Sequence, residues 1–285
     1  MTSAKIIADS ISEAGIRIIT LELEFLRFLL AQFNTHRMFS RSAQSSRAVP
    51  VEKMIEGIKK DSFIPIFMKN ESGMQSTEFI EGFDLTRCNE YWRQAKEQCL
   101  YFARGLKNAG VHKQFVNRLL EPFSTVKVVV TATEWDNFFK LRLHHAAQPE
   151  MKKLAQAMKT AMDESHPEIL INGEWHLPYV DSFNEFTDSK SYKSHIEKCS
   201  LISVARCARV SYLNHDNSNP DIEKDLELAR QLLADGHLSP FEHQAKPMIN
   251  DVIQWRNGVT HASKNGEQWS NNFRGWIQHR ALLSC

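Results

Sequence analysis

The sequence has almost no excess of charge of either sign. Its 35 Lys and Arg residues and its 34 Asp and Glu residues leave a formal net charge of +1. A protein that binds nucleic acid through the phosphate backbone carries a clear basic excess. We therefore expect no nucleic-acid partner.

Cysteine is scarce and follows no pattern. The five cysteines are odd in number, and no two of them form a C-x-x-C pair. This usage indicates reduced thiols in a cytoplasmic setting, and it is not typical of a disulfide framework or of a cysteine-bound metal. We expect no metal centre.

Long apolar runs are also missing. No run approaches the roughly 18 residues that a membrane span needs. The N-terminal residues show no signal peptide, because the short apolar stretch that begins at Lys5 meets Asp9 at once. With 42% hydrophobic and 24% charged residues, the composition is that of a globular protein with no membrane partner.

What the sequence does contain is a donor-rich segment at residues 35–47. It holds three arginines, one histidine, four serines and no acidic residue. The preceding residues 25–33 are apolar except for Arg27 and Gln32 and predict a buried helix. Such donors at a helix end suit an anion such as phosphate, although a solvated basic loop would have a similar composition.

Apolar periodicity and turn residues predict a mixed α/β or α+β fold. The predicted strands are residues 16–24, 126–133 and a short one near 169–171. The predicted helices are residues 25–33, 51–60, 89–108, 112–120, 134–142, 151–163 and 219–235. In the helix over 89–108, the spacing predicts a buried face made of Trp92, Ala95, Cys99, Phe102 and Leu106. In the helix over 151–163, the apolar stripe of Met151, Leu154, Met158 and Met162 predicts the side that faces the core.

The chain divides into three parts that we expect to form one integrated domain. Residues 1–165 carry the donor-rich segment and would bind an anion such as phosphate. Residues 166–200 have little pattern and are interpreted as an insertion or loop region. Residues 201–285 carry the sequence Ser-Pro-Phe-Glu-His at 239–243.

Three segments resemble the flavin-dependent thymidylate synthase (ThyX) family. That family's signature is Arg-His-Arg, seven residues and then Ser; here Thr35 precedes His36 and Arg37, and Ser45 follows seven residues later. Residues 137–150 resemble its Asn-x-x-x-Leu-Arg and Ala-Gln-x-Glu elements, and residues 208–243 resemble its Ala-Arg-Val-Ser and Pro-Phe-Glu-His elements.

The chain departs from the family both in signature residues and in the order of its elements. Thr35 replaces the first arginine of the signature, Ser42 and Ala43 replace an Asn-Glu pair, and Ala48 replaces an aromatic residue. The Pro-Phe-Glu-His element precedes the signature in the family but follows it here. This order predicts a circular permutation or, as the alternative, an exchange of equivalent parts between subunits.

The resemblance implies a set of site residues. The residues implied to bind a pyrimidine nucleotide are Gln32, Ser45, Ser46, Arg47, Arg118 and Arg142, of which Arg142 and Ser45 are implied to be catalytic. The residues implied to bind FAD are His36, Arg37, Met38, Asn137 and His243.

The resemblance also implies a fold and an activity: a central sheet flanked by helices, a homotetramer, and conversion of dUMP to dTMP with methylene-tetrahydrofolate and NADPH. No cysteine stands next to a proline or histidine, which argues against the cysteine-dependent route. The alternatives are a dUMP or dCMP hydroxymethylase of the same family and a non-catalytic nucleotide-binding protein.

Overall fold

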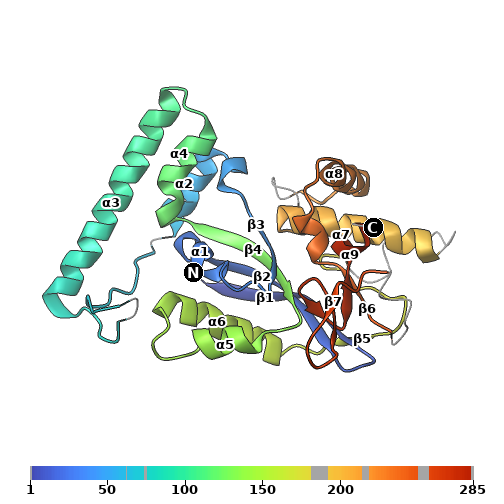
Figure 1. Ribbon diagram of the computed structural model, residues 1–285. Coiled ribbons are helices and arrows are strands. Elements are labelled where there is room, and N and C mark those ends of the chain that lie inside the picture. The colour runs from blue at the N-terminus through green and yellow to red at the C-terminus, as the bar shows by residue number, and fades with distance from the viewer. Residues whose placement is uncertain are drawn as a thin grey trace.

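A five-stranded sheet lies at the centre of the computed structural model (Figure 1). The structure describes residues 2–61, 63–73, 76–180, 192–213, 218–249 and 257–283. The strand order is β3-β4-β2-β1-β5, and all neighbours are antiparallel except β1 and β5. The strands are β1 (Ser3–Ser12), β2 (Arg17–Leu26), β3 (Ser40–Ala43), β4 (Thr125–Ala132) and β5 (Glu168–Leu170).

Side-chain alternation along β2 and β4 gives the sheet two different faces. Leu21 and Leu23 of β2 point to one face, with Val128 and Val130 of β4 opposite them, and all four are fully buried. Helices α5 (Asp136–Arg142) and α6 (Pro149–Asp163) cover this face, which we call the apolar face. The predicted stripe of methionines along α6 is part of its core.

The C-terminal third of the chain covers the opposite face, which we call the polar face. It comprises α7 (Tyr192–Arg209), α8 (Ile222–Ala234), the 3₁₀ turn η4 (Ser239–Glu242) and α9 (His279–Leu283). Short strands complete it: β6 (Ala245–Pro247), β7 (His261–Ala262), β8 (Gln268–Ser270), β9 (Phe273–Arg274) and β10 (Trp276–Gln278). In Figure 1 these elements lie together on the right of the sheet.

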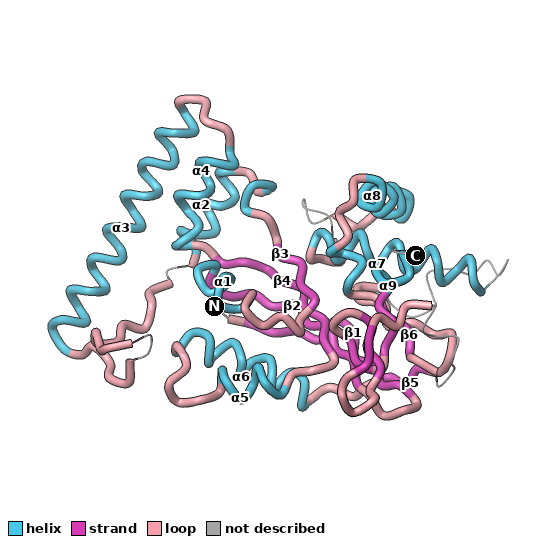
Figure 2. Tube along the Cα trace, viewed as in Figure 1, coloured by secondary structure: helices cyan, strands magenta, loops and turns pink. Residues whose placement is uncertain are grey.

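Three helices form a separate layer at the other end of the molecule (Figure 1). They are α2 (Val51–Lys60), α3 (Gly82–Asn108) and α4 (Lys113–Leu120), and they share one apolar cluster. Figure 2 draws the described residues between α2 and α3 as loop. None of the described helices combines the length and the apolar character that crossing a bilayer requires.

The structure confirms most of the predicted elements, including α2, α4, α6, α8, β4 and β5. The helix predicted over residues 25–33 is wrong in its first part, because Phe25 and Leu26 continue β2 and pair with β4. Only Leu30–Phe33 forms an α-helix, α1, after the 3₁₀ turn Arg27–Leu29. An apolar run of this length does not distinguish a strand from a helix.

Two further expectations are corrected. Residues 192–200 begin helix α7 and are not loop, whereas residues 181–191 of the predicted loop region lie outside the described residues. On α3, Phe102 and Leu106 are 55% and 38% exposed, and Leu100 and Ala103 are buried instead. The packing partners α2 and α4, which single-helix periodicity cannot reveal, select the buried stripe of α3.

Candidate active site

Segment 35–47 is held at the end of α1 by its own arginine. Arg41 donates from Nη1 to the backbone carbonyls of Asn34 (2.9 Å) and His36 (2.7 Å). Beyond this turn the chain enters β3, which pairs with β4 at the edge of the sheet. The segment therefore has a defined path and is not a loose basic loop.

Arg142 at the end of α5 reaches this segment. Its Nε donates to Nε2 of His36 across 2.9 Å. Burial, together with the charges of Arg142 and Arg41, lowers the pKa of His36 to about 4. At neutral pH His36 is therefore an uncharged acceptor that orients the Arg142 guanidinium.

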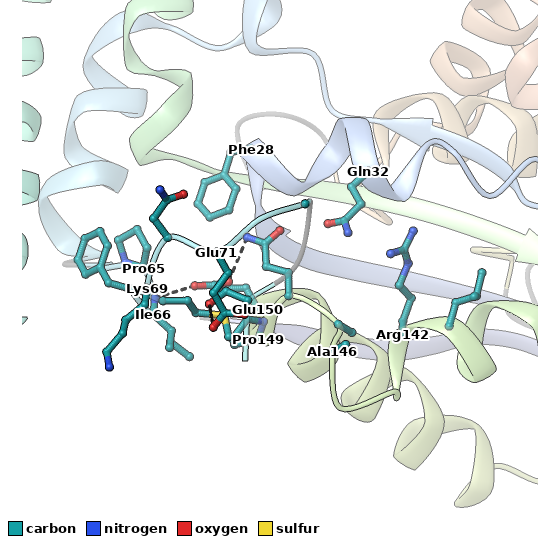
Figure 3. A pocket seen from close by; sticks show the side chains of 18 of the residues that line it. Phe28, Gln32, Pro65, Ile66, Lys69, Glu71, Arg142, Ala146, Pro149 and Glu150 are labelled. Atoms are coloured by element: carbon teal, nitrogen blue, oxygen red, sulfur yellow. Dashed lines mark hydrogen bonds between the residues drawn. The ribbon is translucent and has the colours of Figure 1, made fainter. Parts of the chain in front are cut away.

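Two cavities of about 1020 and 480 Å³ meet at Arg142. Both are lined by Thr35, Leu141 and Arg142. The larger one, shown in Figure 3, also contains Gln32 of α1 and part of the loop between α2 and α3. The smaller one contains His36, Arg37, Met38, Asn137 and Trp269.

Gln32 faces Arg142 within the larger cavity (Figure 3). Its Oε1 atom is buried and has no hydrogen-bond partner in the part of the chain that the structure describes. A buried acceptor without a donor is costly, so this atom suits a ligand N–H group. Arginine and glutamine together offer donors and one acceptor to such a ligand.

The residues expected to bind phosphate form another group, around Glu121. Ser46 donates from Oγ to Glu121 Oε1 (2.5 Å), and Arg118 Nη1 lies 3.7 Å from Glu121 Oε2. Asn117 of α4 fixes the turn by donating to the carbonyls of Ser46 and Val49, both at 2.8 Å. The neighbouring side chains of Ser45 and Arg47 are exposed.

His243 reaches segment 35–47 from the opposite face of the sheet. It is fully buried, and its ring nitrogens lie 2.9 Å from Thr131 Oγ1 and 3.0 Å from Ser42 Oγ. Burial, together with the charge of His176, lowers its pKa to about 3. His243 therefore contacts the segment through Ser42, but it lines neither cavity.

Sequence reasoning missed some residues of this region. Trp269 lines the smaller cavity. Asn272 and Gln278, which both hydrogen-bond to the Ser40 hydroxyl, were not missed: they belong to residues 271–280, a tail whose sequence echoes the family's helix followed by His-Arg and predicts a part of the flavin site. Ser42 is the partner of His243. The one signal in the sequence for Ser42 was its place in the signature, where it replaces the family's asparagine.

Sequence comparison identifies the family. The profile of the family described as thymidylate synthase complementing protein matches residues 16–168, which is more than half of the chain. The chain therefore belongs to this family. The match includes segment 35–47 and α5 and ends before the Pro-Phe-Glu-His element at 240–243.

Two solved structures of a UMP/dUMP methylase, PolB from Streptomyces cacaoi, are similar to this chain. The complex with 5-Br UMP is 14% identical, has a TM-score of 0.47, and the alignment covers 57% of this chain and 89% of that chain. For the complex with 5-Br dUMP the identity is 13%, the TM-score 0.45, and the coverage 57% and 91%. No curated protein gives a significant match.

Proposed function

We propose that this protein modifies C5 of a pyrimidine nucleotide and that it is a flavin-dependent thymidylate synthase. It would convert dUMP to dTMP, with methylene-tetrahydrofolate as carbon donor and NADPH as reductant. Family membership supports the chemistry, and one observation supports the site: the His36–Arg142 pair lies where two cavities meet. Two adjoining cavities suit a nucleotide and a cofactor that react with each other.

The larger cavity is proposed to hold the pyrimidine ring. A uracil edge presents two carbonyl oxygens on either side of an N–H group. Arg142 supplies donors for a carbonyl, and Gln32 Oε1 supplies the acceptor for the N–H. Because a guanidinium stays protonated, Arg142 acts on catalysis by stabilising negative charge that develops on the ring carbonyl.

The smaller cavity is proposed to hold the flavin. The residues present fit such a group, because Arg37 and Asn137 offer polar contacts and Met38 and Trp269 offer apolar surface. When bound, the flavin supplies the hydride that completes the methyl group. The protein's part is to place the pyrimidine ring beside it, and Arg142 lines both cavities.

The predicted residues around Glu121 are proposed to bind the nucleotide phosphate, whereas His243, predicted to bind the flavin, would support that site through Ser42. Ser45 and Ser46 precede Arg47 in one turn, and Arg118 approaches from α4. The phosphate would compete with the Glu121 carboxylate for Ser46 and Arg118. We propose further that the segments are circularly permuted and that the protein assembles as a homotetramer in the cytoplasm.

An absorbance spectrum of the purified protein tests the cofactor, because bound flavin gives characteristic visible bands. The reaction is then tested with dUMP, methylene-tetrahydrofolate and NADPH, with dCMP in parallel, and the product is identified by mass. A gain of one methyl group on dUMP confirms the proposal, whereas a hydroxymethyl group or reaction of dCMP assigns the alternative enzyme. Nucleotide binding without flavin and without product would identify a non-catalytic binding protein.

A further inference from the structure

Four hydroxyls and two imidazole rings form an unbroken hydrogen-bonded chain across the polar face. In order, its members are Ser10, His176, Thr20, Thr131, His243 and Ser42. The successive donor–acceptor distances are 2.9, 2.8, 2.7, 2.9 and 3.0 Å. The chain thus joins segment 35–47 to strand β1 at the other side of the sheet.

The sheet itself places these groups. The hydroxyls come from the four adjacent strands β1, β2, β4 and β3, and all point to the polar face. Both histidines are held over them by β6: His176 pairs through its backbone with Ala245, which lies two residues after His243. All members except Ser42 are at most 4% exposed, so water does not replace these bonds.

Each bond in this chain fixes the direction of the next. Burial lowers the pKa of His176 and of His243 to about 3, so both rings are neutral at pH 7. A neutral ring has one donor and one acceptor nitrogen, and a hydroxyl has one proton to donate. A hydroxyl can also accept twice, but if Thr20 or Thr131 did so, its own buried proton would have no partner among the described residues. With every proton bonded, all five bonds run either from Ser10 to Ser42 or from Ser42 to Ser10.

The two directions present different chemistry at Ser42. If the bonds run toward Ser42, both rings carry their proton on Nε2, and the Ser42 proton is available for a ligand. If they run the other way, both rings carry it on Nδ1, and Ser42 donates to His243. Only the first direction offers a donor to the oxygen atoms of a nucleotide.

We propose that the Ser42 hydroxyl is a further nucleotide contact of segment 35–47 and that Thr20, Thr131, His176 and His243 are positioning residues that hold it as a donor. The nucleotide part of this proposal rests on the proposed function. In the sequence, Ser42 of β3 lies between the cavity residues 35–39 and the proposed phosphate-binding residues 45–47. Binding of an acceptor oxygen selects the direction toward Ser42, and the hydrogen bonds carry this choice across the sheet.

The first experiment reads the ring tautomers by long-range ¹H–¹⁵N NMR in the full-length protein labelled at histidine. We expect His176 and His243 to carry the same tautomer in the free protein and the Nε2–H form with dUMP bound. Opposite tautomers in the dUMP complex would overturn the proposal, because they would break the common direction. If the two rings were packed together without these hydrogen bonds, nothing would require His176 and His243 to carry the same tautomer.

The second experiment measures dUMP affinity in a double-mutant cycle. Ser42→Ala and Thr131→Val should each weaken dUMP binding about threefold to tenfold, the effect of one neutral hydrogen bond, and Thr131→Ser should restore it. Once Ser42 is Ala, Thr131→Val should cost no further affinity. A full additional loss in the double variant would contradict the positioning role.

Thr125→Val is the matched control for these variants. Thr125 is the first residue of β4, the strand that also carries Thr131. Its hydroxyl donates to Glu24 and is not a member of the hydrogen-bonded chain from Ser10 to Ser42. The Thr125→Val variant should bind dUMP with the wild-type affinity. If the wild-type protein binds no dUMP, the proposed function and the Ser42 contact both fail; if dUMP binds but the tautomers are opposite, the proposed function stands and this inference fails.

Discussion

The two faces of the central sheet are built by different physics. On the apolar face, Leu21, Leu23 and Val128 pack against Leu154 and other side chains of α6. On the polar face, Thr20 and Thr131 instead hydrogen-bond to His176 and His243. Apolar packing tolerates exchange of one hydrophobic side chain for another of similar volume, whereas each member of a buried polar network needs one particular partner.

This difference explains why a substitution affects more distant groups on the polar face than on the apolar face. A change on the polar face leaves a buried donor or acceptor without a partner, and the effect passes to the next hydrogen bond. A change on the apolar face leaves a cavity that neighbouring side chains partly fill. The proposed nucleotide contacts therefore combine a rigid support from one face with directional control from the other.

Lowering the pH should have the largest effect on the free energy of unfolding among the changes considered. Burial lowers the pKa of His176 and His243 to about 3 and that of His279 to about 4, against about 6.5 in an unfolded chain. The unfolded state then binds more protons, so stability is complete above pH 6.5 and falls as the pH decreases toward these values. His36, whose pKa is also about 4, behaves in the same way. At pH 5 each ring should cost about 2 kcal/mol, and the four together about 8 kcal/mol.

Denaturant unfolding at pH 7 and at pH 5 measures this loss. His279→Gln is the informative variant, because it removes one of the four histidines with a lowered pKa and should reduce the pH-dependent loss by about a quarter. An unfolding free energy that does not change between the two pH values would show that the buried rings do not titrate as described.

On the apolar face, Leu23→Ala should lower the free energy of unfolding by about 2–5 kcal/mol, because it opens a cavity beneath α6. The loss should be the same at pH 7 and at pH 5, since no titrating group is removed. Leu23→Met is the control and should cost less than about 1.5 kcal/mol. A loss from Leu23→Ala that depends on pH would mean that the two faces are coupled.

Arg142→Ala should affect turnover and not stability. Loss of a donor to a developing negative charge typically lowers the turnover rate about a hundredfold or more. The flavin should remain bound and reducible by NADPH, because the other residues of the smaller cavity are unchanged. Steady-state kinetics with dUMP measure the effect. Near-normal turnover with weaker nucleotide binding would make Arg142 a binding residue only.

Arg47→Ala should weaken nucleotide binding by about 1.5–3 kcal/mol, as expected for loss of a hydrogen bond to a charged group. Flavin retention should not change. Arg93→Ala, on the exposed side of α3, is the matched control and should leave affinity unaltered. Titration calorimetry with dUMP makes the measurement, and unchanged affinity of a folded Arg47 variant would exclude it from the phosphate site.

The smallest effect is expected on α3. Phe102→Ser should change the free energy of unfolding by no more than about 0.5 kcal/mol, because the ring is 55% exposed. Leu100→Ala, one helical stripe away and fully buried, should cost about 2–5 kcal/mol. A large loss for Phe102→Ser would indicate that an assembled partner covers this ring.

Local sequence determined the elements that carry their own periodicity. The alternation at residues 20–24 predicted β2, and the stripe from Met151 to Met162 predicted α6 and its buried side. The donor-rich composition of residues 35–47, with seven residues between Arg37 and Ser45, predicted an anion-binding segment. These signals need neighbours within a few residues, so a linear sequence contains them.

Tertiary structure decided what depends on pairing across long distances in the chain. Phe25 and Leu26 became strand because β4, about 100 residues later, pairs with them. Arg142 contacts His36, and His243 contacts Ser42 and Thr131, because folding brings the sheet and the layers on its two faces together. Side-chain type predicts that a histidine can donate or accept, but only the fold determines which groups surround it, because burial and partners come from segments that are distant in sequence.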